Sequence, residues 1–504
     1  METMSLRKLA LIAAFLCLSL GHPLKEKELG FPEDFIWAAA TSAYQVEGGV
    51  IGTGRGPSIW DRYLALHPPA HNQTGDVACD TYHKYEEDAI LMKKQGLKSY
   101  RFSISWSRIF PDGRVHRVNP EGVQYYHNLI DALLKQDITP VVTLYHWDLP
   151  LSLGDLGGWL TSEIVDWFGD YARFCYQEYG SKVKQWITIN EPHTQSVYGY
   201  CSQVTVHAPG GFQQNCEWSM YLAGHNFLLA HGRAASIYKN EFQKEQQGKV
   251  GITLNTIWYE PRNETDREAA DFLVQSAFGW FANAIFSEEG DYPAVMKANM
   301  ERLRRKEGRE TSRLPEFTQE QIKELRGSAD FMGLNYYISM IGTKEKGLHE
   351  PRESPTVNST WGRDVGIYMY ADIHWKQMGT TWIRYHPEGL YHLLNFIRTH
   401  YNNVPVYITE NGCMDSPGEG MDDVSRIFFI KGHLKAVQKA IAEDGCDVKG
   451  YFFWSLFDNF EWHAGFTERF GMYHVDFDTP ERTRTPKASA HWYKRVIDNN
   501  AVVE

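Results

Sequence analysis

Two glutamates occupy similar places in the sequence, each at the end of an apolar, β-branched run. Glu191 follows the run in WITINEP at 186–192, and Glu410 ends VPVYITE at 404–410. An ionised carboxylate is costly to bury without partners, so a strand that ends on one needs a chemical reason. Two carboxyl groups that share a cleft can divide the work of a reaction, because one can be protonated while the other is ionised.

The neighbouring residue types predict how these two carboxyl groups differ. Arg101 and the Tyr337 hydroxyl could hold Glu410 as an anion, so we expect them to lower its pKa. Glu191 has no evident cationic partner, and the charge of Glu410 should raise the pKa of Glu191. One acidic and one ionised carboxyl group across a sugar-sized cleft is typical of glycoside hydrolysis. Either glutamate taken alone is more easily explained as a structural residue.

The glutamates depend for their position on a regular alternation of apolar runs and amphipathic segments. Helical spacing is found between the runs, for example at 80–94, 119–134 and 162–179. Eight near-continuous apolar runs separated by helices predict a single α/β domain over residues 22–504, a (β/α)₈ barrel with long βα-loop insertions. The runs are 35–40, 99–105, 139–145, 186–190, 249–255, 330–337, 404–410 and 449–456.

Polar and aromatic residues gather at or just beyond the carboxyl ends of seven of these runs. In a barrel these ends meet on one face, where active sites are built. Seven runs that deliver polar groups to one rim are hard to explain as packing, so the joint pattern favours a site. Its members, besides the two glutamates, are Gln45, Arg101, His146, Trp147, Asn190, Asn335, Tyr337 and Trp454.

The ordered motifs between residues 31 and 477 resemble glycoside hydrolase family 1, the family of retaining β-glucosidases. They are YQVEGG, RFSISWSRIFP, LYHWDLP, INEP, GLNYY, YITENG, WSLFDNFEW and ERFGMYHVD. The resemblance implies that Glu191 is the general acid/base and Glu410 the nucleophile, and that Arg101, Asn335 and Tyr337 orient the nucleophile and the sugar 2-hydroxyl. It also implies sugar contacts from Gln45, His146, Trp147, Asn190, Glu461, Trp462 and Phe470, with Trp454 as a stacking floor.

The resemblance narrows the expected substrate to neutral β-glucosides, with β-galactosides and β-fucosides as further candidates. An anionic Glu461 would repel the phosphate of a phosphosugar. Plant myrosinases carry glutamine where this chain has Glu191, which argues against a plant-type thioglucosidase mechanism for this protein. Thioglucosides and plant defence glucosides remain candidate substrates, because some animal thioglucosidases resemble family members that keep both glutamates. A transglycosylase would use the same residues. The alternative from another class is a non-catalytic sugar- or partner-binding relative, although both glutamates are retained.

The first 21 residues predict export. Arg7 and Lys8 precede an apolar stretch at 9–20, as in a secretory signal peptide, and no later stretch is long enough to span a membrane. Sequons at Asn72, Asn263 and Asn358 are compatible with glycosylation of a secreted protein. We therefore expect a secreted, glycosylated protein that is not embedded in a membrane.

Cysteines, metal motifs and charge limit the other partners. Cys201 and Cys216 flank a short loop and are the best candidates for a disulfide, whereas the other four cysteines beyond the signal peptide are expected to be buried thiols. The sequence contains neither CxxC nor HExxH, so we expect no metal and no cofactor. The formal net charge of −12 argues against nucleic-acid binding. A small-molecule glycoside is the expected partner, and a homodimer stays open.

Overall fold

The computed structural model describes residues 30–201, 207–345, 359–379 and 382–504. The expected signal peptide at 1–21 and the sequon residue Asn358 lie outside these residues. Asn72 and Asn263 lie inside them, and both are exposed. In the part of the chain that the structure describes, no helix is long and apolar enough to cross a membrane.

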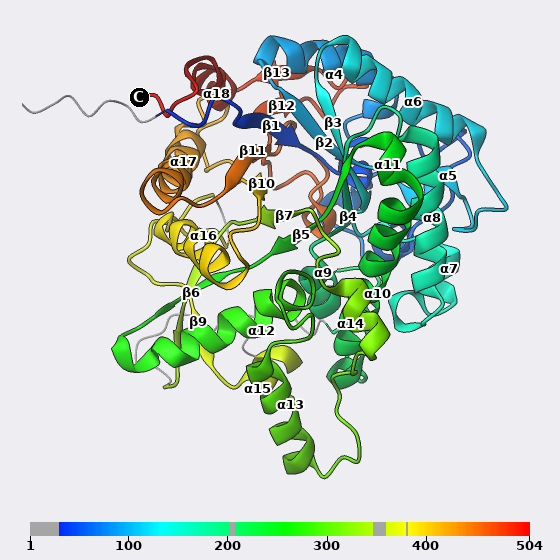
Figure 1. Cartoon of the computed structure of the whole chain (residues 1–504). Helices are drawn as coiled ribbons and strands as arrows, with labels where there is room; N and C mark the ends of the chain where they lie inside the picture. The colour runs from blue at the N-terminus through cyan, green and yellow to red at the C-terminus, as the bar shows by residue number, and fades with distance from the viewer. Residues whose placement is uncertain (1–29, 202–206, 346–358, 380–381) are drawn as a thin grey trace, which may run out of the picture.

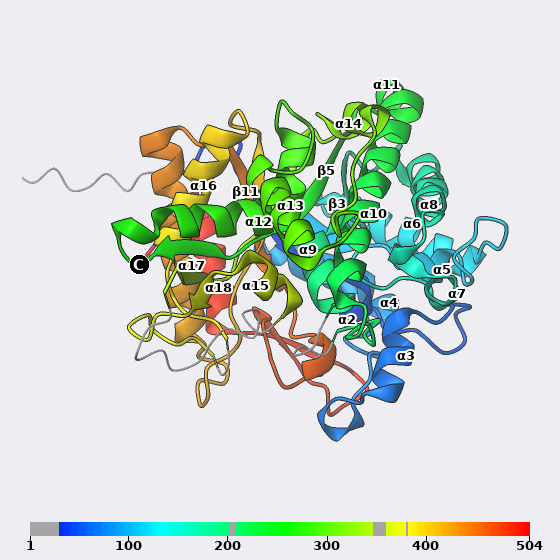
Figure 2. The same cartoon turned by 90° about the horizontal axis from the view of Figure 1, so that it is seen from below.

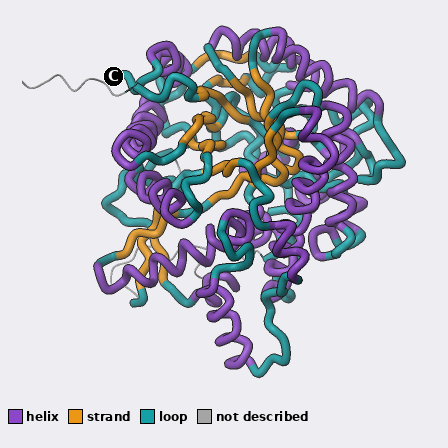
Figure 3. Tube along the Cα trace, in the orientation of Figure 1, coloured by secondary structure: helices purple, strands orange, loops and turns teal. Residues whose placement is uncertain are grey.

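Eight parallel strands close into one barrel at the centre of the molecule (Figure 3). The order around the barrel is β1-β11-β10-β7-β5-β4-β3-β2. Each strand falls on one of the eight predicted apolar runs, and the predicted (β/α)₈ barrel is confirmed. The strands are β1 Ile36–Ala40, β2 Ser99–Ser103, β3 Thr139–Tyr145, β4 Gln185–Asn190, β5 Lys249–Asn255, β7 Phe331–Asn335, β10 Val406–Asn411 and β11 Val448–Trp454.

Long helices surround the barrel, so its strands are covered on the outside as well as filled within (Figure 1). In β4, Trp186, Ile187 and Ile189 are all fully buried, which explains why this strand reads as a continuous apolar run. The predicted helical segments at 80–94, 119–134 and 162–179 correspond to α4, α6 and α8. The long helices are α4 Thr81–Gln95, α6 Pro120–Lys135, α8 Ile164–Tyr179, α10 Cys216–Ile237, α12 Arg267–Phe286, α13 Ala294–Glu307, α16 Glu388–His400, α17 Val424–Asp444 and α18 Ala488–Asn499.

Local sequence signals set where these helices begin and end. Pro120 opens α6, where its missing N–H would be unpaired in any helix. Gly96 ends α4 with φ +88°, a left-handed conformation that favours glycine. The shorter helices are α2 Ala43–Val46, α3 Ile59–Leu66, α5 Trp106–Ile109, α7 Leu151–Asp155, α9 Pro192–Thr194, α11 Gln243–Gln246, α14 Gln319–Leu325 and α15 Thr360–Val365.

Two small sheets lie outside the barrel. The first has the order β6-β8-β9, with β6 Trp258–Pro261, β8 Ser339–Thr343 and β9 Tyr368–Tyr370, and it packs beside α12 (Figures 1 and 2). The second pairs β12 Tyr473–Val475 with β13 Arg484–Pro486. Because β6 follows β5 and β8 follows β7, the first sheet extends the chain beyond the carboxyl ends of two barrel strands.

The first and last barrel strands join the two ends of the described chain. β1 pairs with β11 over five positions, from Ile36 opposite Gly450 to Ala40 opposite Trp454. Nearby, the Asn500 side chain accepts a hydrogen bond from the Trp37 indole N–H at 2.8 Å. The barrel is therefore closed by residues from opposite ends of the sequence.

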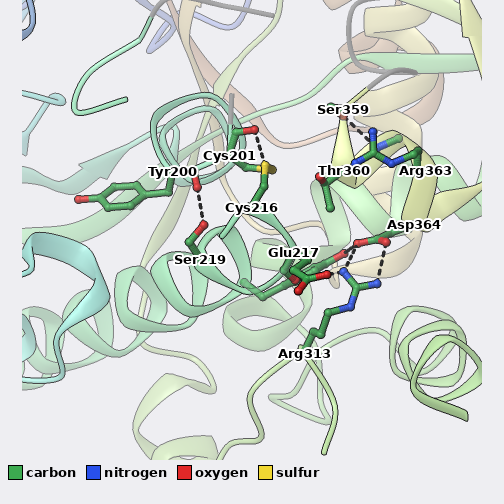
Figure 4. Close-up of a disulfide and its surroundings, with 12 residues drawn as sticks. Tyr200, Cys201, Cys216, Glu217, Ser219, Arg313, Ser359, Thr360, Arg363 and Asp364 are labelled. Carbon is green, nitrogen blue, oxygen red and sulfur yellow. Dashed lines mark hydrogen bonds and ion pairs between the residues drawn. A yellow bond between two sulfur atoms is a disulfide. The ribbon is translucent and has the colours of Figure 1, made fainter. Parts of the chain in front are cut away.

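Cys201 and Cys216 form a disulfide at the start of α10, in agreement with the prediction (Figure 4). Beside it, Arg313 and Asp364 make a buried ion pair of 2.7 Å. The remaining cysteines of the described chain are free and buried, as predicted. They are Cys79, Cys175, Cys413 and Cys446.

Candidate active site

The carboxyl ends of the barrel strands open into one cavity of about 440 Å³. Arg101 and Asn190 do not line it but lie fully buried among the residues that do. The structure thus brings every predicted catalytic and sugar-contacting residue into one place. Those that line the cavity are Gln45, His146, Trp147, Glu191, Asn335, Tyr337, Glu410, Trp454, Glu461, Trp462 and Phe470.

Three cavity residues adopt left-handed backbone conformations that are unfavourable for residues other than glycine. The φ angles are +48° at Glu191, +75° at Trp147 and +51° at Trp462. Such conformations cost free energy and persist where the surrounding structure enforces them, often at functional sites. At Glu191 the conformation follows directly on β4, where the backbone N–H bonds to the Thr253 carbonyl of β5 at 2.9 Å. The strand end is therefore bent at the residue that the chemistry needs.

Glu191 receives its hydrogen bonds from neutral groups. Its Oε1 accepts from the Asn335 amide and its Oε2 from the Thr194 hydroxyl, both at 2.7 Å. The Thr194 oxygen in turn accepts from the Asn255 amide at 2.8 Å. Burial and, to a smaller extent, the charge of Glu410 together raise the pKa of Glu191 to about 7. The predicted direction is confirmed, but burial is a larger cause than the neighbouring charge.

Glu410 lies against a cation. Its Oε1 accepts from the Arg101 guanidinium at 2.7 Å and its Oε2 from the Tyr337 hydroxyl at 2.8 Å. Both predicted contacts are present, yet the predicted lowering of the pKa is wrong. Burial raises the pKa of Glu410, and Arg101 and Tyr337 only partly offset that effect. Of the two glutamates, Glu410 has a cation bonded to it and Glu191 has not. Glu410 is therefore still the better candidate for the carboxyl group that is ionised.

The Arg101 guanidinium is fixed on several sides. It donates to the Thr143 hydroxyl at 3.0 Å and to the side-chain oxygen Oδ1 of Asn190 at 2.6 Å, in addition to Glu410. The amide nitrogen of Asn190 lies 3.2 Å from His146 Nε2. Burial keeps the pKa of His146 well below its usual value, and the charge of Arg101 adds to this, so His146 is neutral and can accept that bond.

One end of the cavity, called the far end here, is formed by Gln45, Glu461 and aromatic rings. It combines aromatic faces with a carboxyl group that can bind two hydroxyls at once. Gln45 donates to the Glu461 carboxylate at 3.1 Å. Trp147 and Trp462 lie 4.9 Å apart between ring centroids, and His146 stacks over Trp454 at 6.0 Å with an interplanar angle of 11°. Burial raises the pKa of Glu461 well above its usual value, and the charge of Glu468 adds to this. Apolar faces beside amide and carboxylate groups suit the C–H faces and hydroxyl pairs of a neutral sugar.

Several cavity residues were not predicted from the sequence. Asn255 ends β5, the one barrel strand from which no polar residue was chosen, so the strand-end pattern itself could have found it. Thr194 lies three residues after Glu191, close enough for its hydroxyl to reach the carboxylate. Most of the others belong to the sheet of β6, β8 and β9 or to segments beside it, which the apolar runs did not predict. The unpredicted residues are Thr194, Tyr198, Asn255, Thr256, Ile257, Ile338, Met340 and Trp382.

The described residues contain no group of side chains arranged to hold a metal ion. No three or more histidine, cysteine, aspartate or glutamate side chains among them are arranged to hold a metal ion.

Comparisons with other proteins agree with this geometry. Residues 27–502 match the family model for glycosyl hydrolase family 1. The chain is 41% identical to human cytosolic beta-glucosidase over 481 residues, covering 94% of this chain and 99% of that protein. It is 40% identical to human lactase/phlorizin hydrolase over 93% of this chain, but it spans only 24% of that longer protein.

Two solved structures extend the comparison. Aphid myrosinase superposes with a TM-score of 0.87 at 40% identity, covering 94% of this chain and 100% of the other. A mutant rice beta-glucosidase in a covalent complex with glucose superposes with a TM-score of 0.84 at 38% identity, covering 94% and 98%. The chain therefore belongs to glycosyl hydrolase family 1 and is a glycoside hydrolase.

Proposed function

We propose that the protein is a retaining β-glycosidase that releases terminal β-D-glucosyl residues from neutral glycosides. The observation that carries this proposal is the unequal environment of two carboxyl groups in one cavity. Glu410 is bonded to a guanidinium, whereas Glu191 has neutral donors and a pKa of about 7. One group is thus suited to be an anion and the other an acid near neutral pH.

In the first step, the ionised Glu410 attacks the anomeric carbon while Glu191 protonates the departing oxygen. This forms a covalent glycosyl ester and releases the aglycone. Esterification removes the charge of Glu410, so the pKa of Glu191 falls and Glu191 becomes a base. In the second step it takes a proton from water, which attacks the ester and releases the sugar. The covalent complex of the rice relative with glucose supports this two-step route.

The far end of the cavity supports a neutral sugar. Glu461, with Gln45 beside it, can bind two adjacent hydroxyls, and Trp454 offers a ring face to the C–H side of the sugar. A phosphate would meet no lysine or arginine among the lining residues that the structure describes. We propose glucose as the preferred sugar, with galactose and fucose as further candidates, in keeping with the names of the beta-glucosidase relatives.

The test follows hydrolysis of a β-glucoside by NMR before mutarotation. The expected first product is the β-anomer, because two inversions at the anomeric carbon give net retention. An initial α-product would overturn the double-displacement route. No turnover of an activated aryl β-glucoside would instead favour the non-catalytic, sugar-binding alternative. Product analysis at high glycoside concentration would separate hydrolysis from transglycosylation.

A second candidate substrate class is the thioglucosides, favoured by the similarity to aphid myrosinase. Both glutamates are present here, so a thioglucoside could be cleaved by the same two steps. Direct measurement of kcat/KM for an O-glucoside and a thioglucoside with the same aglycone would rank the two classes.

We also propose that the protein is secreted and glycosylated. The apolar stretch at 9–20 and the exposed positions of Asn72 and Asn263 support this. When the full sequence is expressed in a eukaryotic cell line, the protein should be found in the culture medium and should lack residues 1–21. Removal of N-linked glycans should increase its gel mobility, and substitution of each sequon asparagine by glutamine should remove one glycan.

A further inference from the structure

We infer that the part of the cavity that receives the leaving group binds an uncharged, apolar aglycone in preference to a second sugar or an anionic group. The inference rests on the proposed function, because it takes Glu191 as the acid that faces the leaving oxygen. The surface concerned is the leaving-group wall, defined here as Tyr198, Ile257, Ile338, Met340 and Trp382.

The leaving-group wall lies on the side of Glu191. A hydrogen-bonded chain runs from Glu191 through Thr194 to Asn255, and Ile257 follows two residues later, just before β6. Ile338 and Met340 flank the first residue of β8, which pairs with β6. Gln45, Trp454 and Glu461, which are proposed to bind the sugar, come instead from α2, the end of β11 and the segment after it. The two ends of the cavity are therefore built by different elements.

Polar groups near the leaving-group wall are already engaged within the protein. The Thr256 hydroxyl donates to the Ile257 carbonyl at 2.9 Å. The Thr194 hydroxyl donates to Glu191, and the Asn255 amide nitrogen donates to Thr194. The exception is the Asn255 side-chain oxygen, which is buried and has no hydrogen-bond partner among the described residues. These three side chains thus leave one buried acceptor for the several hydroxyls of a second sugar.

The wall itself offers few polar atoms. Only the Tyr198 hydroxyl and the Trp382 indole N–H are strong hydrogen-bonding groups among its five side chains. A sugar bound there would give up its hydrogen bonds to water without enough replacements. An alkyl or aryl group needs no such replacements. Trp382 is 45% exposed, so a bound apolar group would also cover apolar surface that now faces water.

The cavity offers no cation to an anionic aglycone. Glu410, the carboxyl group proposed to be ionised, lines it together with Glu191 and Glu461, and no lysine or arginine is among the lining residues that the structure describes. Arg101 lies beneath the cavity and is engaged by Glu410 and Asn190. A sulfate or carboxylate on the aglycone would therefore meet carboxyl groups without a compensating cation.

The first experiment compares kcat/KM for octyl β-glucoside, methyl β-glucoside and cellobiose. All three release an alcohol of low acidity, so the differences report on binding at the leaving-group wall. We expect octyl β-glucoside to exceed cellobiose by about tenfold or more. Cellobiose equal to or better than octyl β-glucoside would overturn the inference. An activated aryl β-glucoside is the reference, because its failure to react would overturn the proposed function instead.

The second experiment tests charge with phenyl β-glucoside and 4-carboxyphenyl β-glucoside, whose phenols differ little in acidity. We expect kcat/KM to be lower for the carboxylated substrate by about tenfold, and the gap to narrow as salt is added. Equal values, or a preference for the carboxylated substrate, would overturn the exclusion of anions.

A matched pair of variants locates the effect at the wall. Met340→Gln adds a polar amide at nearly constant size, whereas Met340→Leu keeps an apolar side chain of similar volume. We expect Met340→Gln to reduce the octyl-to-methyl ratio of kcat/KM by about fivefold, while Met340→Leu keeps that ratio. If the ratio is the same in Met340→Gln as in the wild type, the assignment of the wall is wrong. Circular dichroism would show that both variants are folded.

Discussion

The guanidinium of Arg101 donates to the carboxylate of Glu410 over 2.7 Å, and their side chains are 0% and 5% exposed. A buried carboxylate that keeps its cation is held as an anion more firmly than one with neutral donors only. Glu191 has no such partner, although Asn335 bonds to it and lies beside the same network. This difference between two otherwise similar strand ends suits one carboxyl group to be the anion and the other to be the acid.

Glu191→Gln should affect substrates according to their leaving groups. Glutamine keeps the size of the side chain but cannot donate the acid proton, so alkyl glucosides should lose about 10²–10⁴-fold in rate. Aryl glucosides with acidic phenols need little protonation and should still form the ester with Glu410. The second step should then stall, because no base activates water. Stopped-flow kinetics should show a burst of phenol followed by slow turnover.

Added azide supplies the control for the same variant. Azide attacks the ester without a base, so it should restore turnover of aryl glucosides and give a β-glucosyl azide. Equal slowing of every aglycone, with no burst and no response to azide, would remove Glu191 from the acid/base role.

Glu191→Gln should also stabilise the fold at high pH. The pKa of Glu191 is about 7 in the folded protein against a usual 4.5, so the folded state binds the proton more tightly than the unfolded state. The wild type therefore loses stability as pH rises from 4.5 through 7, and glutamine does not titrate. The variant should gain about 3 kcal/mol relative to wild type between pH 4 and pH 9. Denaturant melts at several pH values would measure this, and a pH-independent difference would contradict it.

Tyr337→Phe should move the acidic limb of the pH profile. The variant loses the hydroxyl that donates to Glu410 at 2.8 Å, a bond that favours the ionised form. The pKa of Glu410 should rise, and the acidic limb of kcat/KM should shift up by about 1 pH unit. Tyr336→Phe is the matched control, because the adjacent Tyr336 hydroxyl contacts Ser339 instead of a carboxylate. Similar shifts in both variants would show a general effect on packing.

Thr194→Val should move the basic limb of the pH profile of kcat/KM. The Thr194 hydroxyl donates to Glu191 at 2.7 Å and stabilises its charged form, so its loss should raise the pKa of Glu191. Activity should then extend to higher pH, with the basic limb of kcat/KM shifted up by about 1 unit. Thr194→Ser keeps the hydroxyl and should keep the wild-type profile. A basic limb unchanged in Thr194→Val would mean that this hydroxyl does not tune Glu191.

Much of this arrangement follows from the sequence, for a physical reason. Parallel strands that are buried on both faces must be apolar along their whole length, so all eight barrel strands were recognisable as runs. The barrel then places their carboxyl ends on one rim, which locates Glu191 and Glu410 without any long-range contact information.

The features of the site that were not predicted depend on tertiary packing, which cannot be read from local sequence patterns. The pKa of Glu410 was predicted in the wrong direction, because the depth of burial is fixed only when the whole barrel and its loops close around the site. Ile338 and Met340 were missed because β8 is a short strand outside the barrel with no clear alternation. The contact of Asn255 with Thr194 depends on how β4 and β5 align, and that pairing contains a shift in register.

Glu461→Ala should separate binding from folding. If Glu461 binds two sugar hydroxyls, its loss removes two hydrogen bonds of roughly 0.5–1.5 kcal/mol each, so kcat/KM should fall by about tenfold or more. Burial raises the pKa of Glu461, so removing the carboxyl group should leave the melting temperature unchanged or higher. A large drop in melting temperature with a modest kinetic change would instead indicate a structural role.

The pairing of β1 with β11 has a consequence for the synthesis of the protein. Gln45 and Glu461, which meet in the cavity, are 416 residues apart, so the ribosome adds Glu461 long after Gln45. Until β11 emerges, β1 has one unpaired edge whose N–H and C=O groups can pair with another chain. A nascent chain that stops before Trp454 lacks both a closed barrel and a complete sugar site. Closure of the barrel and completion of the sugar site therefore both wait for β11, which places the greatest demand for protection from aggregation on chains that have the other barrel strands but not yet β11.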